Sequence, residues 1–144
     1  MNKRGVTLVE LIVVFVVIAI GATLMVPGFT RWMPKYRLRS ATRDIVSTMR
    51  AAQLRAVANS FDYQVVFTPA LGSYILQRNS GGLSTNDGIA QTVPAGITFA
   101  TTFPGNTVVF NSNSTATPGS VTVSNPQDQR TIRVLSSNGR VSAQ

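Results

Sequence analysis

The side chains that could carry acid–base or metal chemistry are few in this sequence of 144 residues. It contains no cysteine and no histidine, so it lacks thiolate and imidazole ligands and the commonest general base. Its five carboxylates are far apart and lie in different kinds of segment: Glu10, Asp44, Asp62, Asp87 and Asp128. This spacing does not indicate a paired-carboxylate site. We therefore expect a protein that is not an enzyme and that holds no metal and no cofactor.

Basic residues are the second group that could do chemistry, and they give the chain a net charge of +8. Most of them fall in one segment, in which only Asp44 opposes them: Arg31, Lys35, Arg37, Arg39, Arg43, Arg50 and Arg55. Near the C-terminus, Arg130, Arg133 and Arg140 could form a small patch for phosphate groups. Because phosphate binding scales with the number of bases engaged, three arginines predict weak DNA binding. The alternative is that these arginines are exposed on edge strands, where they discourage aggregation.

Glu10 is unusual because it stands inside an apolar run. Residues 6–26 are apolar except for Thr7, Glu10 and Thr23, and about 20 apolar residues match the hydrocarbon thickness of a bilayer. We predict that residues 6–33 form the transmembrane half of a long N-terminal helix. Pro27 predicts a kink or a break in this helix, because proline lacks a backbone donor and crowds the preceding turn.

Residues 35–58 are predicted to form the second, amphipathic half of the helix. Apolar residues recur there at three- to four-residue spacing, and most arginines lie off this stripe. The stripe consists of Leu38, Ala41, Ile45, Met49, Ala52 and Ala56. One face of the helix should therefore pack on another element.

The pattern changes after residue 60 to short segments rich in Val, Ile, Thr and Phe, separated by Gly, Pro, Asn and Ser. Such segments predict hairpins of an antiparallel sheet: FDYQVVF, SYILQ, ITFATTF, TVVF, SVTVS, TIRVL and GRVSA. Residues 79–88 and 111–117 are expected to be surface loops. The predicted fold class is α+β, with the long helix packed on a β-sheet over residues 61–143 in a soluble head of residues 34–144.

The chain begins with a basic leader, followed by Gly5, Val6, Glu10 and a long apolar helix that reaches Pro27. This order resembles the N-terminal signal of type IV pilins and type II secretion pseudopilins. The resemblance implies that residues 1–5 are a leader and that a prepilin peptidase cuts after Gly5. The same enzyme would methylate the new N-terminus at Val6, where the family usually has phenylalanine.

The cleavage also offers a physical explanation for the carboxylate. An acidic side chain at the middle of a membrane helix costs about 2.5–3.5 kcal/mol or more, and a cation that pairs with it offsets this cost. Cleavage creates such a cation, the α-amino group of Val6, which a neighbouring subunit could present to Glu10. We therefore assign Glu10 to assembly, together with Pro27, which falls where the family has a helix-breaking proline.

The rest of the chain resembles the GspH/FimT family of minor pseudopilins and minor pilins. The similarity rests on RAAQLRAVANS at 50–60, VVF at 108–110, PGSVTV at 118–123 and the terminal RTIRVLSSNGRVSAQ with its Gly139-Arg140 turn. It implies a structural subunit that joins or primes a type II secretion pseudopilus or a type IV pilus. The alternative within the family is a DNA-binding minor pilin of natural transformation, which would use Arg130, Arg133 and Arg140.

The same resemblance implies partners and a location. The expected partners are other pilins or pseudopilins in a filament, a prepilin peptidase, an inner-membrane assembly platform and membrane lipid, with DNA as a weak further ligand. The expected location is the bacterial inner membrane, crossed once with the N-terminus in the cytoplasm and the head in the periplasm. After assembly the chain would lie in the pilus or pseudopilus.

Overall fold

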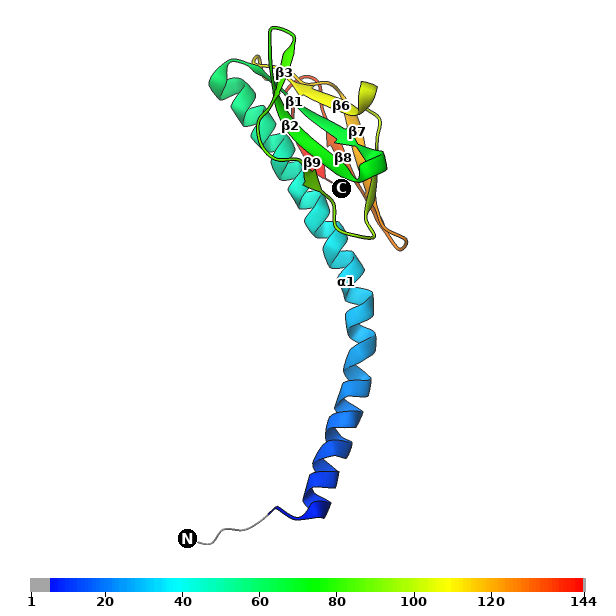
Figure 1. The fold of residues 1–144 in the computed structure, drawn as a ribbon. Helices are drawn as coiled ribbons and strands as arrows, with labels where there is room; N and C mark the ends of the chain where they lie inside the picture. Colours follow the sequence, from blue (N-terminus) through cyan, green and yellow to red (C-terminus); the bar gives the residue numbers. More distant parts are fainter. Residues whose placement is uncertain (1–5, 144) are drawn as a thin grey trace, which may run out of the picture. The chain divides into compact units, whose positions relative to one another are not determined.

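The computed structural model describes residues 6–143, with all side chains in that range except those of residues 24–31. The leader expected at residues 1–5 thus lies outside the described residues. The chain divides into two compact units, Met1–Pro34 and Lys35–Gln144. One helix, α1 (Leu8–Asn59), contributes to both units, and all strands belong to the second (Figure 1).

Helix α1 starts with a side-chain cap. The N–H of Glu10 donates to Oγ1 of Thr7 at 3.3 Å, and the N–H of Leu11 donates to the Thr7 carbonyl at 3.2 Å. Thr7 and Glu10 have the spacing of a capping box, in which the threonine satisfies a free N–H of the first turn. The backbone then stays helical through Pro27 and Pro34. The chain therefore has no break at Pro27: proline removes one hydrogen bond, but its fixed φ is close to the helical value.

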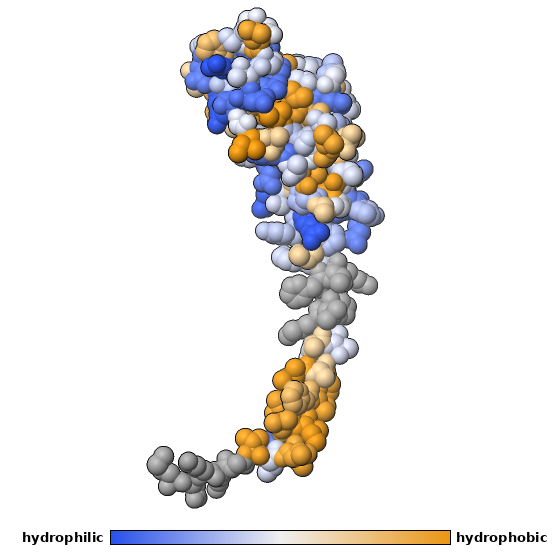
Figure 2. Space-filling model, viewed as in Figure 1, coloured by the Kyte–Doolittle hydropathy of each residue, from blue (hydrophilic) through white to orange (hydrophobic). Residues whose placement is uncertain are grey.

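The large apolar side chains between Val6 and Ile20 are exposed. Their exposed fractions lie between 51% and 74%, and the set comprises Val6, Leu8, Val9, Leu11, Ile12, Val13, Val14, Phe15, Val16, Val17, Ile18 and Ile20. Figure 2 shows this stretch of the helix as almost wholly hydrophobic surface. Within the described residues, no helix combines the length and the apolar character needed to cross a membrane.

Two antiparallel sheets form the rest of the second unit. The first has the order β3-β2-β1-β6, with β4 also paired to β2, and consists of β1 (Asp62–Thr68), β2 (Ser73–Ser80), β3 (Leu83–Asn86), β4 (Gln91–Thr92) and β6 (Thr107–Phe110). The second has the order β5-β7-β8-β9 and consists of β5 (Thr98–Thr101), β7 (Gly119–Ser124), β8 (Gln129–Val134) and β9 (Val141–Ala143). Two short 3-10 helices, η1 (Pro69–Leu71) and η2 (Pro104–Asn106), lie in the connections.

The core lies between the second half of α1 and the inner faces of both sheets. All six residues of the predicted stripe from Leu38 to Ala56 are buried, each with at most 1% of its surface exposed. Alternate residues of the strands meet them, as in β1 and β6, where Val65 and Val108 are fully buried. The predicted α+β class, a long helix packed on antiparallel β structure, is confirmed, although the strands form two sheets.

The segment at residues 79–88 differs from the prediction. It was expected to be a surface loop, but Leu83–Asn86 form strand β3, which pairs with β2 in register from Gln77↔Asn86 to Ser80↔Leu83. All four residues of β3 are exposed, so the segment has no apolar alternation that could reveal a strand. Gly81 and Gly82, both with positive φ, make the tight turn that brings it back onto β2.

Candidate functional site

The N-terminal end of α1 carries the acidic side chain of the first unit. Glu10 is exposed in the first helical turn, where the partial positive charge of the helix end favours a carboxylate. Val6, which is 72% exposed, lies four residues earlier, just before the start of the helix. No basic side chain among the described residues forms a salt bridge with Glu10. The carboxylate is thus accessible to a cation from outside, on an otherwise apolar surface.

Gly5 and Pro27 are the other residues predicted for processing and assembly. Gly5 lies outside the described residues. Pro27 lies within the helical backbone of α1, and its side chain is not among those described.

The three arginines proposed for DNA lie in different places. Arg130 shares the inner face of β8 with the buried Ile132 and Val134, because side chains alternate along a strand. Arg133 is exposed on the opposite face of that strand. Arg140 precedes β9 and lines a hollow of about 380 Å³ together with Arg50 and Asn138. Arg50 and Leu54 of this hollow also line the groove that contains Arg130, so Arg130 and Arg140 line adjoining hollows, whereas Arg133 faces away from both.

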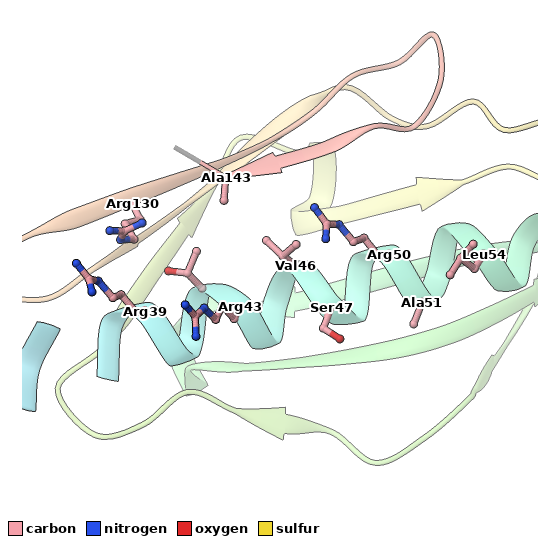
Figure 3. A pocket seen from close by; sticks show the side chains of 10 residues that line it. Arg39, Arg43, Val46, Ser47, Arg50, Ala51, Leu54, Arg130 and Ala143 are labelled. Carbon is pink, nitrogen blue, oxygen red and sulfur yellow. The ribbon is translucent and has the colours of Figure 1, made fainter. Parts of the chain in front are cut away.

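A larger groove brings other arginines together. It has a volume of about 750 Å³ and runs between α1 and the edge of the second sheet. Its lining comprises Arg39, Thr42, Arg43, Val46, Ser47, Arg50, Ala51 and Leu54 of α1, with Arg130 of β8 and Ala143 of β9. Figure 3 shows Arg39 and Arg43 opposite Arg130, with Val46 between them and Arg50. We call this surface the arginine groove.

The sequence places the helix arginines off the apolar stripe and makes them an alternative site for DNA, with the expectation that in a filament their charges would meet acids of other subunits; the groove itself was not predicted. The sequence does indicate part of the groove, because Arg39, Arg43 and Arg50 are four and seven residues apart and so lie on one face of a helix. The contribution of Arg130 could not be found, because it depends on how β8 packs beside α1.

A hydrogen bond and an ion pair tie the second half of α1 to segments of the two sheets. Gln53 Nε2 donates to the Asn138 carbonyl at 2.9 Å and so ties α1 to the turn before β9. Arg55 Nη1 lies 2.8 Å from Asp87 Oδ2, near the end of α1.

Burial raises the pKa of Tyr74 from 10.0 to about 12, and the Asp44 carboxylate acts in the same direction.

The described residues contain no cluster of three or more acidic side chains that could hold a metal ion. The arginines and apolar side chains of the groove offer electrostatic and apolar binding.

Comparison with known protein families gives two matches. Residues 41–139, more than half of the chain, match the family described as type II transport protein GspH. Residues 1–26 match the prokaryotic N-terminal methylation motif. No functionally curated protein matches the sequence.

Solved structures give similar folds at low sequence identity. The minor pseudopilin EpsH of the type 2 secretion system of Vibrio cholerae superposes with a TM-score of 0.61 at 14% identity, over 73% of this chain and 93% of EpsH. The type IV minor pilin FimU of Pseudomonas aeruginosa superposes with a TM-score of 0.65 at 14% identity, over 78% of this chain and 92% of FimU. At this identity the likeness establishes the shared fold.

Proposed function

Since the chain belongs to the GspH family of type II transport proteins, we propose that it is a minor pseudopilin or minor pilin that joins or primes a filament. The filament would be the pseudopilus of a type II secretion system or a type IV pilus. The observation that carries this proposal is the combination of the GspH match over the head with the methylation motif at the N-terminus.

The exposed apolar part of α1 supports the proposal physically. A row of large side chains that are each at least half exposed needs a partner, because contiguous apolar surface of this size is unfavourable in water. Lipid would cover it before assembly, and the helices of other subunits would cover it in the filament. On this proposal residues 6–33 are the membrane-spanning half of the helix and residues 34–144 are the head.

Processing of the N-terminus completes the proposed assembly device. A prepilin peptidase would remove residues 1–5 by cutting after Gly5 and would methylate Val6. The α-amino group of Val6 in one subunit would then meet Glu10 of its neighbour in a low-dielectric environment, where such a pair is much stronger than in water. The pair would fix the axial register between the two subunits.

The proposal includes a location and further partners, which the family match and the methylation motif support. The chain would lie in the bacterial inner membrane, N-terminus in the cytoplasm and head in the periplasm, until an inner-membrane assembly platform moves it into the filament. Members of the family are structural subunits, in keeping with the scarcity of catalytic side chains. The DNA-uptake alternative gains no support, because the family and fold matches do not concern DNA and Arg130 and Arg133 lie on opposite faces of β8.

Fractionation in the native host tests the proposal. The full chain should appear in sheared filaments when the other subunits and the prepilin peptidase are present. It should stay in the membrane fraction when the peptidase gene is deleted. A chain that never enters the filament fraction, while the other subunits do, would refute the proposed function.

A further inference from the structure

We propose that the arginine groove is the docking site for an acidic segment of a different subunit in the same filament. The inference rests on the proposed function and names the chemistry of one partner. It arises from a cluster of cationic side chains that form no salt bridge with an acid of the described part of the chain.

The groove concentrates positive charge on a rigid frame. Arg39, Arg43 and Arg50 project from α1, a helix whose opposite face is fully buried in the core, and Arg130 projects from the paired strand β8 (Figure 3). The backbone beneath these side chains is already ordered, so binding need not order it as it would order a loop. Arginine also offers five donors in a fixed fork that matches the geometry of a carboxylate.

Within the described residues, no acidic side chain pairs with the arginines of the groove. The groove lining contains four arginines and no acidic residue. Among the described residues, the salt bridge that involves an arginine of α1 is that of Arg55 with Asp87, outside the groove. Asp44, the one acid on the second half of the helix, accepts a hydrogen bond from Ser40 and influences Tyr74 of β2, which belongs to the other sheet. When a filament neighbour covers the groove, the buried charges need carboxylates to avoid a desolvation penalty.

The apolar residues that line the groove favour a protein partner over a nucleic acid. Between and beside the arginines lie Val46, Ala51, Leu54 and Ala143, and the Leu54 side chain is 70% exposed. An apolar centre with arginines at its rim is the composition of a protein–protein interface. A phosphate backbone would use the arginines but would leave the apolar floor without a partner.

A second copy of this chain is poorly suited as the occupant. It has only five acids, and most of them already have internal partners. Asp87 pairs with Arg55, Asp62 accepts the N–H of Ser112, and Asp128 accepts the N–H of Gln129. Glu10 lies in the apolar part of the helix. The complementary charge therefore comes from another kind of subunit, one whose exposed surface is rich in Asp and Glu.

A crosslinking experiment with the full chain in its native host tests the inference. A photoreactive residue at Ser47, an exposed position in the groove, should crosslink to one other filament subunit within a segment that contains several acids. A photoreactive residue at Leu83, which is exposed on β3, serves as the control and should not give this product.

Charge-reversal variants test whether the arginines of the groove hold the crosslinked subunit. The Arg43→Glu/Arg50→Glu variant should lower the crosslink and the co-purification of that subunit about tenfold or more, because truncating charged pairs at an interface has effects of this size. Arg133→Glu, on the outer face of β8, is the control for a charge reversal outside the groove and should have no such effect. Acid-to-lysine changes in the crosslinked segment should restore binding to the double variant, which would also show that the variant is folded.

Several outcomes would overturn the inference. Normal co-assembly of the double variant would do so while leaving the proposed function intact. So would a crosslinked segment without acids, a crosslink to a second copy, or competition of the Ser47 crosslink by a DNA duplex added to the solubilised filaments. Absence of the wild-type chain from filaments would instead refute the proposed function and this inference together.

Discussion

The ring of Phe67 on β1 lies edge-on to the ring of Phe99 on β5, with centroids 5.7 Å apart and planes at 70°. The two residues belong to different sheets, so this contact joins the sheets within one core. Phe103, stacked on Phe67 at 6.4 Å, and Tyr74, at 6.0 Å, extend the contact into an aromatic cluster. Such ring pairs add stabilisation beyond their buried area.

The head should therefore unfold as one cooperative unit. A fragment that lacks residues 1–33 keeps the whole second unit and is expected to be a folded monomer. The aromatic cluster and α1 contact both sheets. Far-ultraviolet circular dichroism and the near-ultraviolet signals of tyrosine and phenylalanine should therefore report a single thermal transition. Two separate transitions would mean that the sheets are independently stable.

Ile45→Asp should destabilise this fragment strongly. The Ile45 side chain is fully buried under the sheets, and an unpaired carboxylate there should cost about 3–5 kcal/mol. Leu54→Asp, on an exposed position of the same helix, is the control and should cost about 1 kcal/mol or less. Urea titration of both variants measures the difference, and equal losses would place Ile45 outside the core.

Tyr74 should make the head sensitive to alkaline pH. Its pKa is raised from 10.0 to about 12 in the folded state, so the unfolded chain loses this proton first as the pH rises. The contribution to stability is fully present below pH 10 and is lost progressively between pH 10 and 12. Chemical denaturation of the head across this range should show a smaller pH-dependent loss for Tyr74→Phe than for the wild type. Identical pH profiles would contradict the raised pKa.

Much of the head could be predicted from sequence because its signals are local. The buried stripe of α1 and strands such as β1 and β6 alternate or repeat in ways that a window of residues reveals. The split into two sheets could not be predicted, because it depends on the pairing of Tyr63 with Phe110 and of Phe99 with Val123, which are distant in sequence. The arginine groove was missed for the same reason, since Arg130 reaches it from β8.

Glu10→Val should leave membrane insertion intact and reduce co-assembly with other subunits. The substitution removes the carboxylate but keeps the backbone N–H that Thr7 caps, so the start of α1 should remain helical. Thr7→Val is the complementary control, because it removes the cap and keeps the carboxylate. Quantifying each variant in membrane and filament fractions separates the two roles. Normal filament entry of Glu10→Val would show that the carboxylate does not set the register.

Gly5→Val should abolish processing of the leader. A β-branched side chain would crowd a backbone position that the peptidase must approach, and the chain should keep its full mass. Intact-mass analysis of the wild type should instead give a chain that begins at methylated Val6. Val6→Phe, which restores the residue usual in the family, is the control and should be cut normally. Cleavage of Gly5→Val at the same bond would place the specificity elsewhere.

The turn before β9 is closed by hydrogen bonds alone. Gln53 Nε2 reaches the Asn138 carbonyl, the N–H of Leu135 reaches the Arg140 carbonyl, and Gly139 supplies the left-handed φ of +58° that the turn requires. With no cysteine in the chain, this closure involves no covalent bond. The last hairpin can therefore open and reclose without thiol oxidation, disulfide shuffling or a disulfide isomerase. Reducing agents should leave the stability of the head unchanged, whichever side of the membrane it folds on.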